Sequence, residues 1–176
     1  GELELYDSFA TVLLNQTQTK CVNRTTGLID FRVCKRQTAG LGAGHEAVLR
    51  DIVDWPIGSR DGYVLTNAAN TVINAYAVGG LKALAHMTNA SGNASEAKAL
   101  AEQAESITTA VNTLLWDAKS GLYRDGLDDK SGEPLSHTAW HASVFAAAFG
   151  LVPSERWPSI LAFFRKRGMV GSVYAS

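Results

Sequence analysis

The chain has 176 residues, of which 46% are hydrophobic and 19% are charged, and its formal net charge at pH 7 is −1. This composition excludes an intrinsically disordered chain and leaves enough apolar side chains for a sizeable core. Without a basic excess a nucleic-acid partner is not expected. A membrane is not expected either, because no apolar run approaches the roughly 20 residues that a span needs.

The apolar pattern has a helical period along most of the chain, and it predicts helices over 3–18, 70–87, 95–115, 138–149 and 154–166. Ser95 and Ser154 are the expected N-caps of the third and fifth helices. Gly79-Gly80 predicts a close approach by a neighbouring backbone, and Gly150 is expected in the left-handed conformation at the end of the fourth helix. Tyr76 and Leu161 are expected on buried helix faces. The segments 21–65 and 116–134 are predicted to be irregular, with a turn over 88–93.

Helices paired by tight turns at one end and long loops at the other are typical of stacked antiparallel α-hairpins. The sequence therefore predicts an all-α fold. The long irregular segment 21–65 is expected to carry the functional site, because long loops in compact proteins usually have a function.

Sequons for N-glycosylation and a cysteine pair indicate the compartment. Four N-x-Ser/Thr sequences begin at Asn15, Asn23, Asn89 and Asn93, which favours a secreted, extracellular glycoprotein. Cys21 and Cys34 flank a short polar segment, and a disulfide closing such a loop contributes roughly 3 kcal/mol. Two reduced cysteines in a cytosolic protein are the alternative.

The stretch from Asp54 to Tyr63 concentrates carboxylates, an arginine and aromatic rings within ten residues. Carboxylates accept hydrogen bonds from sugar hydroxyls, an arginine supplies fixed donors, and aromatic faces cover the C–H side of a pyranose. A carbohydrate site is therefore one interpretation, and a polar surface loop anchored by Trp55 is the other. His137 and His141, four residues apart, are predicted to share a helix face. A site-lining or core role is favoured for them over a metal site, and neither a metal nor a cofactor is expected.

Several motifs, collinear over nearly the whole chain, resemble those of the bacterial and fungal α-L-rhamnosidases, whose catalytic domain is a six-hairpin (α/α)6 barrel. The resemblance runs through Thr26-Gly27-Leu28-Ile29, Asp54-Trp55-Pro56, Arg60-Asp61-Gly62-Tyr63, Asn70-Thr71-Val72-Ile73-Asn74-Ala75, Leu115-Trp116-Asp117, Gly121-Leu122-Tyr123-Arg124-Asp125-Gly126, His141-Ala142, Phe149-Gly150-Leu151-Val152-Pro153, Arg167-Gly168-Met169 and Ser172-Val173-Tyr174. It implies that residues 1–176 form about half of such a barrel.

The resemblance also implies hydrolysis of terminal α-linked L-rhamnose with inversion, by a carboxylic acid and a carboxylate base. It implies substrate binding by Asp54 and an aromatic contact by Tyr63, and Arg60 from the same stretch and the site-lining His141 are predicted substrate contacts beside them. The acid glutamate of the family stands five residues after the aspartate that Asp54 matches, and Ser59 occupies that position here. Asp61 is the nearest substitute, but two helical steps would turn it to the other side. The base lies downstream of the matched segment, so no catalytic residue is assigned.

Three interpretations follow from these departures. The first is a segment of an active α-L-rhamnosidase whose remaining hairpins, including the catalytic base, lie outside this segment, although Ser59 in place of the acid glutamate argues against activity. The second is a non-catalytic extracellular glycan-binding or structural protein derived from a rhamnosidase, and the third is a helical glycoprotein without a ligand. The expected partners are a rhamnose-containing glycan and further chain, or a partner subunit, that covers the open faces of the hairpins.

Overall fold

The computed structural model describes residues 10, 21–33, 53, 57–66 and 68–168. Four helices dominate these residues: α2 (Thr71–Ala90), α3 (Ala94–Leu114), α4 (Trp140–Ala148) and α5 (Trp157–Arg167). Two short 3-10 helices, η2 (Ile57–Ser59) and η3 (Ser154–Arg156), and a hairpin of β1 (Trp116–Asp117) and β2 (Leu122–Tyr123) complete the elements. The predicted all-α fold is confirmed. Of the predicted helix over 3–18, the structure describes only Ala10, which is helical.

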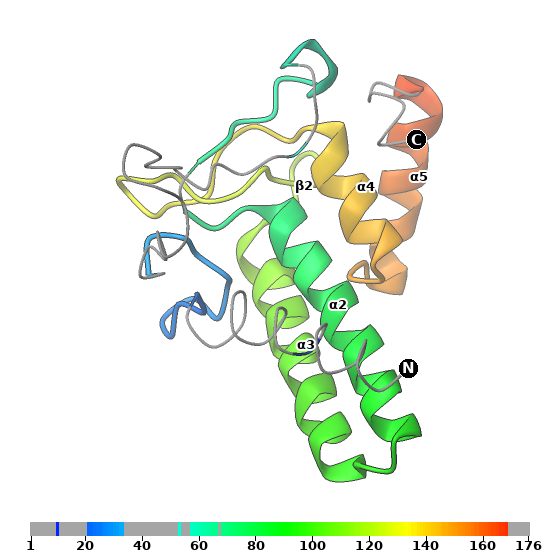
Figure 1. Cartoon of the computed structure of the whole chain (residues 1–176). Coiled ribbons are helices and arrows are strands. Elements are labelled where there is room, and N and C mark those ends of the chain that lie inside the picture. Colours follow the sequence, from blue (N-terminus) through cyan, green and yellow to red (C-terminus); the bar gives the residue numbers. More distant parts are fainter. Residues whose placement is uncertain (1–9, 11–20, 34–52, 54–56, 67, 169–176) are drawn as a thin grey trace.

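Helices α2 and α3 form a long antiparallel hairpin, closed by a tight turn at one end (Figure 1). Asn70 caps α2, because its Oδ1 accepts hydrogen bonds from the amides of Val72 and Ile73 at 2.9 and 3.2 Å. Helix α2 continues to Ala90, three residues past the predicted end. Asn93, and not the predicted Ser95, caps α3: its Oδ1 accepts from the Glu96 amide, and its Nδ2 donates to the Glu96 carboxylate.

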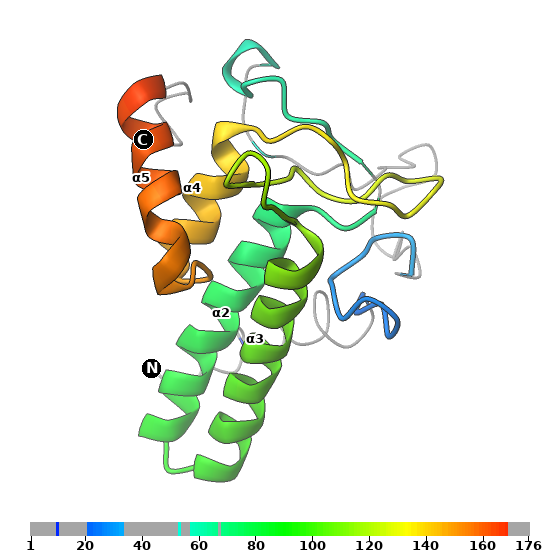
Figure 2. The same ribbon diagram turned by 180° about the vertical axis from the view of Figure 1, so that it is seen from behind.

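Helix α4 packs against the upper half of α2, and α5 follows on the outer side of α4 (Figures 1 and 2). The prediction that Gly150 adopts the left-handed conformation is confirmed, with φ of +68°. Gly79 shows why α2 carries glycine there: a Cβ at this position would lie 2.3 Å from Cδ1 of Phe149. The close neighbour is thus the Phe149 ring and not a backbone.

The core lies between α2 and α3 and continues under α4, and its largest apolar members include Leu28, Ile29, Leu81, Leu84, Ile107, Leu115 and Ile160. Two predicted core residues are instead exposed, Tyr76 by 50% and Leu161 by 41%. In α5 only Ile160 is buried. Ser154, the predicted cap of the fifth helix, instead begins η3, and the residue at the N-cap of α5 is Arg156. Among the described helices, none is long and apolar enough to cross a membrane.

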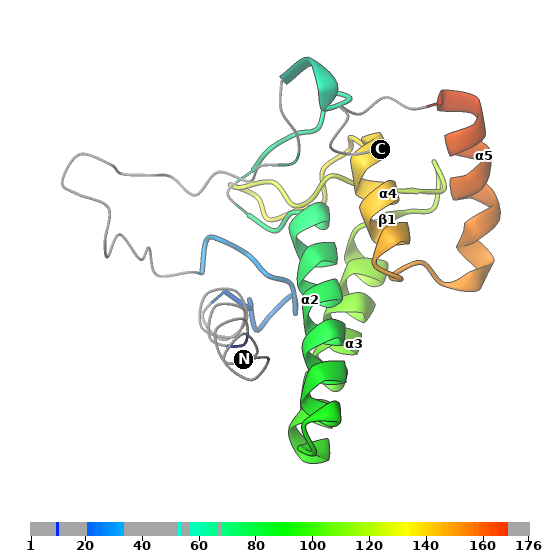
Figure 3. The same cartoon turned by 45° about the vertical axis from the view of Figure 1, so that its right-hand side comes forward.

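The irregular segments gather at the end of the α2–α3 hairpin opposite its tight turn (Figure 3). Segment 21–33 is fastened to α2, because the Asn74 side chain accepts from the Ile29 amide and donates to the Ile29 carbonyl at 2.8 and 3.0 Å. The β1–β2 hairpin forms within the predicted irregular segment 116–134, with Trp116 opposite Tyr123. The loop 57–66 and the start of α4 lie at this same end.

Candidate functional site

The loop from η2 to Thr66 reverses direction immediately after Ser59. The Tyr63 amide donates to the Arg60 carbonyl at 2.9 Å, and the two residues between them, Asp61 and Gly62, have φ of +51° and +71°. Glycine adopts this left-handed region without cost, and aspartate is one of the few other residues that tolerate it. Ser59 and Arg60 remain partly exposed on this turn.

Asp61 joins this loop to two later segments. Its Oδ2 accepts a hydrogen bond from the Trp140 amide at 2.8 Å, at the first residue of α4, and its Oδ1 accepts from Nη2 of Arg167. Its side chain is only 10% exposed. The residue N-terminal to α4, Ala139, has no side chain that could cap the helix, and Asp61 supplies that acceptor from 79 residues upstream.

Tyr63, a predicted substrate contact, lies beneath the loop and is 6% exposed. Its hydroxyl donates to the carbonyl oxygen of Asp125 and lies 2.9 Å from Oδ1 of Asn70. The tyrosine therefore ties the loop to the N-cap of α2 and to the segment after β2.

Asp125 is a fully buried carboxylate below the same loop. Its Oδ2 accepts from the Val64 amide at 2.8 Å and lies 2.7 Å from Nδ1 of His137, while its Oδ1 accepts from the Ala139 amide at 2.7 Å. A buried carboxylate is stable only when donors surround it. These contacts meet that need and connect three segments that are distant in sequence.

The two histidines do not share a helix face, contrary to the prediction. Helix α4 begins at Trp140, so His137 lies in the loop before it, where its side chain is 42% exposed. His141 is fully buried, with its ring edge-to-face against Tyr63 at 6.4 Å and against Trp140 at 5.4 Å. Helix α4 begins at Trp140, whose amide donates to Asp61. His137 therefore precedes the helix and His141 lies within it.

The structure thus places the predicted residues of the loop in two layers, one at the surface and one buried, and the buried layer includes His141. Ser59 and Arg60 are partly exposed, and the Tyr63 and His141 rings pack below them. Asp54 lies outside the described residues. Sequence reasoning assigned no role to Asp125, although it stands in the Gly121–Gly126 motif, and it gave His137 a site-lining or core role without placing it beside Asp125.

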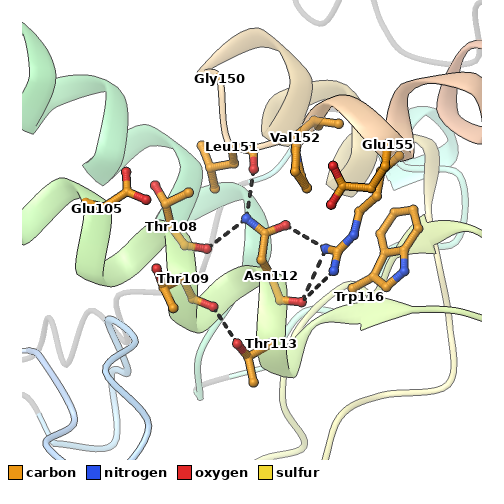
Figure 4. A pocket seen from close by; sticks show the side chains of 12 residues that line it. Glu105, Thr108, Thr109, Asn112, Thr113, Trp116, Gly150, Leu151, Val152 and Glu155 are labelled. Carbon is orange, nitrogen blue, oxygen red and sulfur yellow. Dashed lines mark hydrogen bonds between the residues drawn. The ribbon is translucent and has the colours of Figure 1, made fainter.

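A groove of about 660 Å³ lies elsewhere, between α3 and the segment from Gly150 to Arg156 (Figure 4). Asn112 occupies its centre: Nδ2 donates to the carbonyls of Thr108 and Leu151, and Oδ1 accepts from Arg156 and from the Tyr123 hydroxyl, both at 2.6 Å. The Arg156 guanidinium lies 4.3 Å from the centroid of the Trp116 ring. Burial raises the pKa of Tyr123, which keeps its hydroxyl protonated as a donor. These polar groups brace α3 against η3, and no predicted site residue lines the groove.

Comparison with known proteins decides the family. Residues 53–168 match the model of the mannosylglycerate hydrolase MGH1-like glycoside hydrolase domain. The chain belongs to this family of glycoside hydrolase domains. The matched range contains the whole loop 57–66, Asp125, both histidines and all four helices. No curated protein matches the chain.

A solved structure extends the comparison to nearly the whole chain. A GH78 family rhamnosidase of Bacillus sp. GL1 superposes with a TM-score of 0.72 at 18% sequence identity, over 96% of this chain and 15% of that one. The chain therefore spans about one seventh of the length of that protein and shares the fold of this part of it. The helices form part of the toroid that the rhamnosidase resemblance implies.

Proposed function

We propose that this glycoside hydrolase domain is of the α-L-rhamnosidase type and recognises terminal α-linked L-rhamnose. The rhamnosidase motifs of its sequence, the family of its matched range and the fold that it shares with a GH78 rhamnosidase support this substrate class. Ser59 and Arg60 offer a hydroxyl and a guanidinium on the surface of the loop, as recognition of sugar hydroxyls requires.

The loop around Ser59 lacks a carboxylic acid at the position where hydrolysis needs one, which favours binding without hydrolysis. An inverting glycosidase needs a carboxylic acid that donates a proton to the leaving oxygen. Ser59 stands at the position of that acid, and a serine hydroxyl is far too weak an acid for this step. Asp61 is the nearest carboxylate in sequence, but each of its oxygens already accepts a hydrogen bond, from Trp140 and from Arg167. The engagement of Asp61 is the observation on which this proposal depends, because it removes the nearest substitute for the missing acid.

A non-catalytic glycan-binding role in the extracellular space is therefore the function that we favour over hydrolysis by this chain. The four sequons support secretion, as does the proposed disulfide between Cys21 and Cys34. Cys21 is buried, and Cys34 lies outside the described residues.

Tyr76 is half-exposed, although it forms an aromatic cluster with Phe145 and Phe149 at ring distances of 5.2 and 4.8 Å. This exposed aromatic surface supports the proposal that more chain or a partner subunit covers this side of the hairpins.

The test measures binding and turnover separately. Titration calorimetry with methyl α-L-rhamnoside is expected to show binding by the wild-type chain, weakened in Arg60→Ala and unchanged in His86→Ala. His86 serves as the control because it is exposed near the far end of α2. No 4-nitrophenol should be released from 4-nitrophenyl α-L-rhamnopyranoside.

Two results would contradict the proposal. Absence of binding to methyl α-L-rhamnoside would remove the substrate class. Turnover that is present in the wild-type chain and disappears in Asp61→Asn would instead identify Asp61 as the acid and restore the hydrolytic function.

A further inference from the structure

Asp125 fixes the protonation pattern of the His137 ring. Each Asp125 oxygen accepts a hydrogen bond from a backbone amide, that of Val64 or of Ala139. An ionised Asp125 has only acceptors, so with its carboxylate charged the contact of 2.7 Å between Oδ2 and His137 Nδ1 places a proton on Nδ1. In the neutral ring Nε2 then carries a lone pair and no proton.

That lone pair lies against the loop of the candidate site. A Cβ built on Gly62 would lie 3.1 Å from Nε2 of His137 and 3.4 Å from its Cε1, so this edge of the ring lies directly beside the turn that follows Ser59 and Arg60. The His137 side chain is 42% exposed, although its partner Asp125 is fully buried. The Nδ1 edge of the imidazole is thus anchored inside the protein, and the opposite edge lies beside the Gly62 turn in a side chain that is partly exposed.

The surroundings hold this edge in place. Asp61 joins the loop to Trp140, the first residue of α4, and Asp125 joins it through Val64 to Ala139, so the turn and the imidazole are both held at the start of α4. A side chain held by buried hydrogen bonds loses little conformational freedom when it binds a ligand. The ring is therefore a prearranged acceptor beside the loop.

We propose that His137 is a ligand-binding residue of this site, whose Nε2 accepts a hydrogen bond from a sugar hydroxyl, and that Asp125 is its positioning residue. This inference rests on the proposed function and adds a specific contact to it. A carboxylate behind a histidine also occurs at metal sites, but the described residues contain no group of three side chains that could hold a metal ion. A hydroxyl donor is the ligand group that matches one ring acceptor on a partly exposed side chain.

Two substitutions separate the two edges of the ring. In His137→Asn the side-chain amide nitrogen reaches the position of Nδ1 and can still donate to Asp125, but nothing remains at the position of Nε2. In His137→Gln the amide oxygen reaches the position of Nε2, while the donor to Asp125 is lost. We expect His137→Asn to fold with near wild-type stability and to bind methyl α-L-rhamnoside about fivefold more weakly, the loss of one hydrogen bond. His137→Gln should be less stable but bind more tightly than His137→Asn.

Nitrogen-15 NMR of the histidine rings supplies a readout that a purely structural role would not change. Neutral His137 should carry its proton on Nδ1, and saturating methyl α-L-rhamnoside should shift the Nε2 resonance. The His86 ring should not respond, and His86→Ala should bind like the wild type.

The results distinguish this inference from the proposed function. If His137→Asn binds as strongly as the wild type, the role of His137 is overturned and the rhamnoside site stays in place. The same holds if His137→Gln binds more weakly than His137→Asn. A neutral ring with its proton on Nε2 would overturn it as well. No binding by the wild-type chain would refute the proposed function, and the role of His137 with it.

Discussion

Asp61 caps a helix that begins 79 residues after it, through a hydrogen bond of 2.8 Å from the Trp140 amide to its Oδ2. The same carboxylate accepts from Arg167, 106 residues away, so one side chain in the loop holds both ends of the α4–α5 pair. Asp61, the nearest substitute for the acid in the sequence, is in this way part of the framework of the site.

Replacement of Asp61 tests this role. Asp61→Ala should lower the free energy of unfolding by about 1–2 kcal/mol, because the Trp140 amide loses its acceptor. Asn in Asp61→Asn keeps an acceptor for the Trp140 amide and tolerates the left-handed backbone. The decrease in the free energy of unfolding should therefore be smaller and come from the ion pair with the half-exposed Arg167. Urea unfolding followed by tryptophan fluorescence measures both variants. Equal stability of Asp61→Ala and the wild type would show that the cap is dispensable.

Gly126 is predicted to tolerate no side chain. A Cβ there would lie 2.2 Å from the Ala69 carbonyl oxygen and 3.1 Å from Cα of Asn70, where segment 68–70 pairs with the residues after β2. Since the obstacle is backbone, Gly126→Ala should destabilise the protein by about 3 kcal/mol or more. Gly58→Ala is the matched control, because a Cβ at Gly58 meets nothing within 4 Å. Thermal unfolding that shows the same melting temperature for both variants would contradict the close approach at Gly126.

The buried Asp30 should make stability sensitive to acid. Burial by itself raises the pKa of Asp30, but hydrogen bonds from the side chain and backbone of Arg32 and from Asn23 outweigh it and hold the pKa below its ordinary value of 3.8. A pKa that is lower in the folded than in the unfolded state stabilises the fold fully above about pH 5, and this contribution is lost as pH falls through the folded pKa.

Unfolding measured between pH 7 and pH 2 checks this dependence. Asp30→Asn should be less stable than the wild type at pH 7, and the difference between the two should shrink toward pH 2. A difference that stays constant over this range would show that the charge of Asp30 does not contribute.

The described sequons should differ in their occupancy by glycan in a secretory host. Asn93 caps α3 with both atoms of its amide group, and Nδ2 of Asn23 donates to the carboxylate of Asp30 at 3.1 Å. A glycan on either nitrogen competes with these bonds, whereas Asn89 is exposed in the last turn of α2. Mass spectrometry of tryptic glycopeptides is expected to find the highest occupancy at Asn89. A higher occupancy at Asn93 would contradict this order.

The sequence determined the helical part of this protein because the signals for it are local. Apolar residues at helical spacing predict α2 and α3. Gly150 marks the end of α4 because glycine readily adopts the left-handed backbone conformation found there. Even the error at the start of α3 is local, since Asn93 and Ser95 are both good caps and lie two residues apart. The motif around Ser59 likewise predicted, from local residues alone, a site on this loop.

Only the tertiary structure decided what the residues of that loop do. Tyr63 is a structural support beneath the loop, Asp61 is a helix cap, and Asp125 turns His137 toward Gly62. Each of these roles depends on a hydrogen bond between residues 12 to 106 positions apart. No periodicity or short motif encodes such a pair, because the two partners meet only after the helices have packed.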